Sequence, residues 1–164
     1  MTAGHTDATL TAFAPEWASY QAKLIAALAP LTPAQLALRP APGLRAIGQI
    51  ARHVIGARSR WLHDFMPQDA AMLAEFGGWD RKDAPERTGA ELADALTRTW
   101  QPLERALTTW TEPELSEHLA STDPDDPPNL SRRWILWHLI EHDLHHGGEI
   151  SYVLGMNGLA APDI

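Results

Sequence analysis

SRRWILWHLIEHDLHHGGEI, residues 131–150, is the stretch that decides how the rest of the chain must fold. Ser131 has the hydroxyl that favours a helix N-cap, so the stretch is predicted to be helical. Residues four apart share one face of a helix, so His142 and His146 can direct two imidazoles at one atom. Half of a metal site is therefore predicted on this helix, which carries half of the eight histidines of the chain: His138, His142, His145 and His146.

The bulk composition indicates one globular domain spanning residues 1–164. An apolar fraction of 45% is ordinary for such a domain, and a chain of this length can bury a core without covalent staples. Cysteine is absent, which excludes disulfides, thiolate metal ligands and a cysteine nucleophile. These features fit a cytoplasmic protein.

Charge and hydropathy exclude two classes of partner. The formal net charge is −8, and the 13 basic residues are spread along the chain, so no nucleic-acid partner is expected. No apolar run approaches the roughly 20 residues that span a bilayer, so no membrane partner is expected. Met1 to His5 lacks the charged and apolar regions of a signal peptide. The expected partner is a small-molecule substrate.

Apolar residues at helical spacing predict three more long helices, over residues 6–29, 44–65 and 88–110. Asp7 or Thr6 stands where it can cap the first of them. No stretch alternates apolar and polar residues over a useful length, so no sheet is expected.

Shorter signals mark the connections. Capping boxes at Thr32–Gln35 and Thr88–Glu91 begin a short helical turn and the third long helix. Further turns are expected near 70–76 and 111–114, and residues 121–129 form an acidic, proline-rich loop. The chain is therefore predicted to be all-α, a four-helix bundle with short extra helical turns in the connections.

His53 is the natural third ligand for a metal held by His142 and His146. It lies in the middle of the second long helix among apolar neighbours, and bundles build metal sites from side chains on facing helices. Three neutral imidazoles leave a coordination position open, which is typical of catalytic sites. Each histidine also has a structural interpretation, as a hydrogen-bonded core residue or as part of a solvated helix.

The remaining histidines have other expected roles. His138 and His145 lie near the ligand face of the last helix, where each can line the pocket or replace a ligand. His63 and His118 are expected at the surface or at helix caps. His5 lies in a terminus that is expected to fray.

Glu149 shares the helical face of His142 and His146. It can orient an imidazole, act as the catalytic base on a metal-bound water, or ligate the ion itself. The alternative is an ion pair with an arginine of a neighbouring helix: Arg45, Arg58 or Arg60.

The motifs GQIARHVI at residues 48–55, EHDLHHGGEI at 141–150 and RPAPG at 39–43 together resemble the DinB / YfiT-like superfamily, over nearly the whole chain. The resemblance implies a four-helix bundle that binds a divalent ion, commonly zinc or nickel, through His53, His142 and His146. Members often have Arg-Gly-Gln after the last ligand, where this chain has Gly147-Gly148-Glu149. The roles of the replaced Arg and Gln therefore do not carry over, and the substrate charge preference can differ.

Some members of that superfamily are thiol-dependent S-transferases that use bacillithiol or mycothiol, and one is a mycothiol-dependent isomerase. The resemblance therefore implies a metal-dependent enzyme that transfers a low-molecular-weight thiol cosubstrate to a small substrate. A metal-dependent hydrolase and a metal-binding bundle without turnover are the alternatives. A zincin-like peptidase would need Asp143 in place of the glutamate of His-Glu-x-x-His, and a di-iron centre would need carboxylates that the helices lack.

The substrate pocket is expected at the bundle end that carries residues 68–87 and the chain after Gly155. Arg60 is a candidate anion contact there. The candidate apolar walls are Trp79, Phe76, Met156 and Leu159. A small and mostly apolar substrate is therefore expected. Trp79 can instead plug the end of the bundle.

A homodimer is also expected, because seven tryptophans exceed the needs of one small core, and exposed aromatics, here Trp61, Trp79 and Trp110, mark interfaces.

Overall fold

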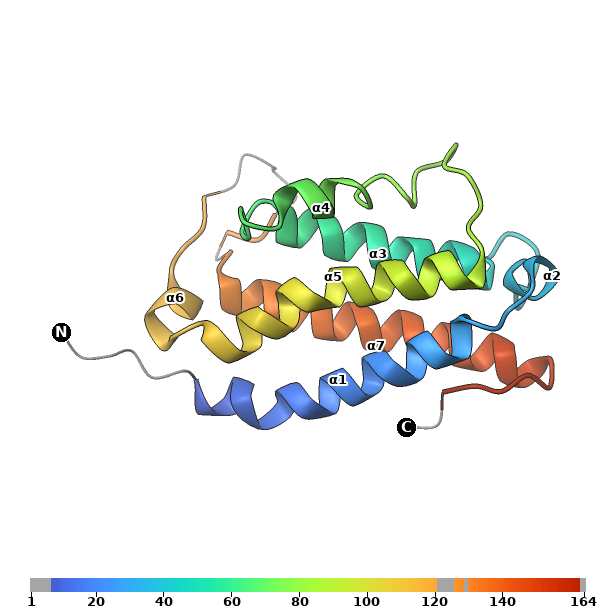
Figure 1. Cartoon of the computed structure of the whole chain (residues 1–164), viewed down its shortest axis with the longest axis horizontal. Helices are drawn as coiled ribbons and strands as arrows, with labels where there is room; N and C mark the ends of the chain where they lie inside the picture. Colours follow the sequence, from blue (N-terminus) through green and yellow to red (C-terminus); the bar gives the residue numbers. More distant parts are fainter. Residues whose placement is uncertain (1–6, 121–125, 129, 163–164) are drawn as a thin grey trace.

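The computed structural model describes residues 7–120, 126–128 and 130–162. Four long helices and three short ones lie in these residues (Figure 1). The long helices are α1 (Ala8–Leu28), α3 (Ile47–His63), α5 (Gly89–Thr109) and α7 (Arg132–Met156). The short ones are α2 (Pro33–Leu36), α4 (Ala70–Ala74) and α6 (Glu112–Ser116). Within the described residues there is no strand, and His118 and Ser131 form an isolated bridge. The predicted all-α bundle is confirmed.

The helices begin where the capping residues predicted. The Asp7 carboxylate accepts hydrogen bonds from two amides of the first turn of α1. The Thr88–Glu91 capping box is formed, and the Ser131 hydroxyl accepts from the Trp134 amide at 3.2 Å. Thr6, His5 and most of the acidic loop at 121–129 lie outside the described residues.

The second long helix is shorter than its apolar stripe predicted. It begins at Ile47 rather than near Leu44, because the Gln49 side chain accepts a hydrogen bond from the Ala46 amide and closes the first turn there. It ends at His63, and α4 is one turn within the predicted 70–76. None of the described helices is both long enough and apolar enough to cross a membrane.

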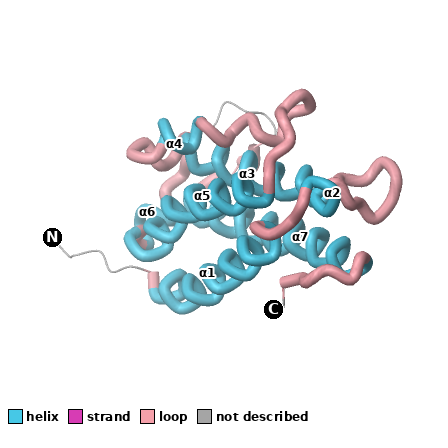
Figure 2. Tube along the Cα trace, turned by 45° about the vertical axis from the view of Figure 1, so that its right-hand side comes forward, coloured by secondary structure: helices cyan, strands magenta, loops and turns pink. Residues whose placement is uncertain are grey.

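The packing pairs α1 with α5, and α3 with both α5 and α7. In Figures 1 and 2, α3 and α7 lie side by side and run in opposite directions. Opposed directions bring the middle of α3 next to the middle of α7, so that His53 can meet His142 and His146.

A polar layer crosses the middle of the bundle, between two apolar clusters of the core. Each long helix contributes one residue to it: Gln21, Arg58, Thr99 and Asp143 are all buried. The Arg58 guanidinium donates to the Asp143 carboxylate at 2.7 Å and to the Gln21 carbonyl at 2.8 Å. Gln21 and Trp17 also donate to the same carboxylate oxygen. Arg58 also donates to the Thr99 hydroxyl at 3.4 Å, so the layer ties together all four long helices.

The connection from α4 to α5 lies along α3, because α3 and α5 run in the same direction and the chain must return between them (Figure 1). Arg60 donates to the Gly77 carbonyl at 2.6 Å, and Arg52 donates to the Ala84 carbonyl at 2.9 Å. These contacts fix the connection against the face of α3 that carries His53.

The tryptophans expected to be exposed are not. Trp110 is buried, and Trp61 packs against Trp134 with ring centroids 5.3 Å apart. Trp79 packs against Phe76 and lies under the Arg87 guanidinium. Trp137 on α7 is the exposed one, with 62% of its surface accessible. The aromatic argument for an interface therefore named the wrong residues.

Candidate metal centre

Three imidazoles converge where α3 meets α7. His53, His142 and His146 each offer a ring nitrogen, and these atoms all lie within 4.8 Å of one another. The Nε2 atoms of His53 and His142 are 3.2 Å apart, and the His142 and His146 ring centroids are 4.4 Å apart. The structure thus brings together the three histidines that the sequence singled out.

Asp80 contacts the ring nitrogen of His53 that does not face His142. Its Oδ2 lies 2.9 Å from His53 Nδ1, and Arg60 binds both of its oxygens at 2.8 and 2.9 Å. Burial raises the pKa of Asp80, but the hydrogen bonds from Arg60 and His53 outweigh it and lower the pKa to about 2. Asp80 is therefore a carboxylate at neutral pH that accepts the Nδ1 proton, which leaves the Nε2 lone pair of His53 facing His142.

Sequence reasoning missed Asp80. It lies 27 positions from His53, in an irregular connection, and no periodicity relates the two. The available signal was an acidic residue directly after Trp79. Gly56 also belongs to this contact, because a Cβ there would lie 2.8 Å from Asp80 Oδ1, so only glycine lets the carboxylate approach α3 without a shift.

Glu149 holds His146 in the same way. Its Oε2 lies 2.6 Å from His146 Nδ1, and its Oε1 lies 3.7 Å from His145 Nε2. The expected alternative, an ion pair with Arg45, Arg58 or Arg60, is wrong, because among the described residues Glu149 pairs with His145 and His146, while Arg58 binds Asp143 and Arg60 binds Asp80. The position of Glu149, on the Nδ1 side of His146, suits an orienting role and leaves Nε2 free to ligate.

Burial disfavours the protonated form of two of the converging rings, His142 and His146. Desolvation, reinforced by the neighbouring His146 and His53, lowers the pKa of His142 to about 3. Desolvation also lowers the pKa of His146, against the opposing effect of Glu149. Neutral imidazoles are the form that ligates metal ions.

The donor set fits a divalent cation. Two nitrogens that each lie about 2.0–2.1 Å from one tetrahedral ion are about 3.3 Å apart, close to the 3.2 Å between His53 and His142. Two lone pairs facing each other at that distance repel unless a proton or a cation lies between them. Imidazole nitrogens suit zinc, nickel, copper and iron.

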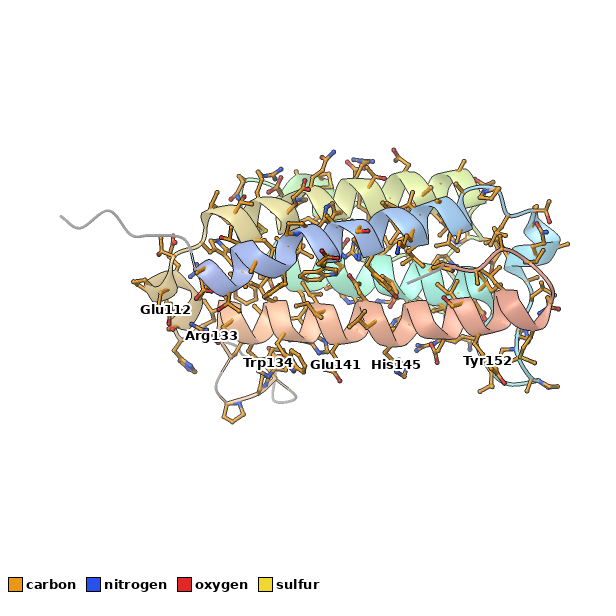
Figure 3. The ribbon with its side chains drawn as sticks, turned by 90° about the horizontal axis from the view of Figure 1, so that it is seen from below. Glu112, Arg133, Trp134, Glu141, His145 and Tyr152 are labelled. Carbon is orange, nitrogen blue, oxygen red and sulfur yellow. The ribbon has the colours of Figure 1, made fainter. Side chains whose placement is uncertain are left out.

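The other histidines lie outside the three-ligand group. His138 stacks on Trp134 at 5.0 Å, one turn before His142, and burial lowers its pKa despite the nearby Glu141. His145 is exposed on the outer edge of α7, where Figure 3 also shows Glu141. His63 and His118 are exposed, in keeping with their expected surface positions.

Asp143 faces the core rather than the metal centre. It is fully buried and accepts hydrogen bonds from Arg58, Gln21 and Trp17. A carboxylate enclosed in this way has no access to a water molecule at the histidines, so the zincin-like alternative is wrong. The converging group consists of histidines alone, which also disagrees with a di-iron carboxylate centre.

A polar cavity of about 570 Å³ opens beside His53. The apolar walls expected there are absent: Phe76 is buried in the core, and Trp79 packs on it away from the cavity lining. Arg60 does line the cavity, but its guanidinium is bound to Asp80. The lining residues come from α3 and from the two connections beside it: Arg39, Gly43, Leu44, Arg45, Gln49, Arg52, His53, Arg60, Asp80, Arg81 and Lys82.

Comparison with known proteins finds one matching family and several similar structures. The sequence profile of the DinB family matches residues 5–164. A DinB-like protein from Bacillus cereus ATCC 10987 has a similar structure, with a TM-score of 0.66 and 23% identity over 93% of this chain and 95% of that protein. The DinB-like protein YjoA from Bacillus subtilis has a TM-score of 0.65 and 15% identity over 93% and 96%. No curated protein sequence matches this chain. At these identities the structural likeness shows the fold alone.

Proposed function

We propose, from the premise that this chain belongs to the DinB family, that it is a divalent-metal-dependent enzyme whose ion is held by His53, His142 and His146. We further propose that it transfers a low-molecular-weight thiol, of the bacillithiol or mycothiol type, to a small substrate. The observation that carries the proposal is the convergence of three imidazoles, two of which have a carboxylate oxygen within hydrogen-bond distance of Nδ1.

Zinc or nickel, bound by three histidines, would retain an open position at which its charge lowers the pKa of a thiol or of water. The chain has no cysteine, so the sulfur must come from a cosubstrate. In the transfer, the thiol gives its proton to solvent water, and the sulfur forms a bond to an electrophilic carbon of the substrate as a leaving group departs with its electron pair. Asp80 and Glu149 serve by holding the imidazole planes and tautomers.

Metal content tests the first half of the proposal. His53→Ala, His142→Ala and His146→Ala should each remove most of the bound metal, measured as ions per chain after gel filtration. His63→Ala and His118→Ala are the matched controls, since both residues are exposed and lie outside the converging group. Unchanged metal content in any of the first three variants would remove that residue from the ligand set.

A thiol-conjugation assay tests the second half. The metal-loaded protein is mixed with bacillithiol or mycothiol and the electrophile monobromobimane, and the thioether product is quantified. Product that forms faster with wild type than with His142→Ala supports the transferase. Ester hydrolysis without any thiol would favour the hydrolase alternative, and full metal loading without either reaction would favour a metal-binding bundle without turnover.

A further inference from the structure

We propose that the cavity beside His53 is an anion site, which binds a carboxylate or phosphate group of the molecule that reacts at the metal centre. The proposal rests on the proposed function only for calling that molecule a substrate or cosubstrate. The observation is a local reversal of charge. The chain as a whole carries −8, yet this cavity is lined by six cationic side chains and a single carboxylate: Arg39, Arg45, Arg52, Arg60, Arg81 and Lys82 against Asp80.

Three of the six cationic side chains already donate hydrogen bonds to acceptors within the protein. Arg60 binds Asp80 through two hydrogen bonds, which neutralises the one acidic side chain of the lining. Arg52 binds Glu86 at 2.9 Å and two backbone carbonyls of the connection. Arg39 donates to the Leu44 carbonyl at 3.4 Å.

Three cations remain. The side chains of Arg45, Arg81 and Lys82 are exposed and have no hydrogen-bond or ion-pair partner among the described residues. Arg45 lies just before α3, and the other two lie in the connection that runs along α3. Like charges gathered around one cavity repel each other, so an anion bound between them is favoured. The planar fork of arginine also matches the oxygens of carboxylates and phosphates.

The position and size of the cavity point to a small reactant. A volume of about 570 Å³ is within the range of pockets for small molecules. Because His53 belongs both to the lining and to the converging histidines, a molecule anchored by its anionic group lies next to the metal centre. The proposed substrate therefore carries an anionic group, whereas the sequence suggested a mostly apolar one.

Calorimetric titration with malonate and with inorganic phosphate tests the site and separates the two anion chemistries. We expect at least one of these probes to bind the wild-type protein, and the neutral malonamide to bind neither strongly nor in a salt-dependent way. Arg45→Gln and Arg81→Gln should each weaken anion binding about tenfold, and Lys82→Gln should weaken it by a smaller factor. Lys23→Gln is the matched control: Lys23 is also an exposed lysine without a described partner, but it lies on α1.

The titration is repeated on metal-free and zinc-loaded protein, so that the anion site and the metal site are judged separately. Anion binding that persists without metal, and in His142→Ala, supports the cationic cavity even if the proposed enzyme function fails. Binding that requires the metal and ignores the arginine variants would overturn the proposal, because the ion itself would then be the anion site. No binding of either anion to wild type would also overturn it, as would an equal loss in Lys23→Gln.

Discussion

His53 has a different neighbour on each ring nitrogen. Its Nδ1 meets Asp80, which Arg60 holds in place, and its Nε2 faces His142. The ring plane of a candidate metal ligand is thus set by an acidic residue from an irregular connection. Gly56 makes the approach possible, since any side chain there would meet the carboxylate.

Asp80→Asn should lower zinc affinity by about 10–100-fold, the usual effect of removing a carboxylate that orients a histidine ligand. The amide keeps the size of the side chain but loses the charge that makes Nδ1 the protonated nitrogen. Competition with a chelator of known affinity measures the change. Asp83→Asn is the control, since Asp83 is an exposed acid of the same connection. Equal affinities of the two variants would contradict the orienting role of Asp80.

The pH dependence of metal binding follows from the burial of His142 and His146. The pKa of His142 is lowered to about 3, so this ring stays neutral as pH falls through 6.5, where a free imidazole gains its proton. The pKa of His146 is also lowered, so it gains its proton at a lower pH than a free imidazole does. Protons therefore compete with the ion less than they would at three unperturbed histidines. The apparent zinc dissociation constant is measured by chelator competition from pH 7.5 to 5. Its logarithm should rise by less than three for each unit by which the pH falls, which means that fewer than three protons are displaced per bound ion. A slope of three would show that burial does not protect the rings.

Helix α7 serves two sites at once. One face directs His142 and His146 at α3, while Asp143 between them turns into the polar layer with Arg58 and Gln21. The backbone of α7 is held there as well, because the Tyr20 hydroxyl donates to the Asp143 carbonyl at 3.0 Å. The register of α7 against its neighbours is therefore fixed at the level of His142 and His146, the candidate ligands.

Asp143→Ala should lower the free energy of unfolding by about 3–5 kcal/mol, because it leaves the fully buried Arg58 cation without its partner. Urea denaturation of the metal-free protein measures the loss. Asp94→Ala is the control, an exposed acid of α5. The double variant Asp143→Leu, Arg58→Met should be more stable than Asp143→Ala, since it removes both charges. A loss below about 1 kcal/mol in Asp143→Ala would show that Arg58 finds other partners.

At the scale of the whole molecule, the outer face of α7 is the surface that we expect to form a homodimer. Trp137 and Leu144 lie seven positions apart on one side of α7, with 62% and 50% of their surfaces exposed. A groove between α1 and α7 adjoins them, lined by apolar residues such as Phe13 and Ile140. Aromatic residues on an exposed apolar face are typical of interfaces.

Light scattering should give about twice the chain mass of 18.1 kDa at micromolar concentration. Trp137→Lys should shift the mass toward the monomer, because it places a charge in the centre of the expected interface. Leu44→Ser is the control, since Leu44 is an exposed apolar residue in a different part of the molecule. A wild-type mass near 18 kDa would refute the dimer.

Features set by local geometry were already determined by the sequence. Capping residues such as Asp7, Thr88 and Ser131 begin helices through contacts within one turn. The pair His142 and His146 shares a face because helix geometry repeats every 3.6 residues. The same periodicity placed His53 on a buried helix, and the motifs around these histidines indicated the family.

Only the tertiary structure decided what surrounds those histidines. Asp80 reaches His53, and Arg81 and Lys82 join Arg45, because a long connection must run back along α3 when α3 and α5 are parallel. The polar layer likewise needs one residue from each of four helices at one level. Contacts of this kind join residues tens of positions apart through packing, and helical periodicity acts only over a few turns.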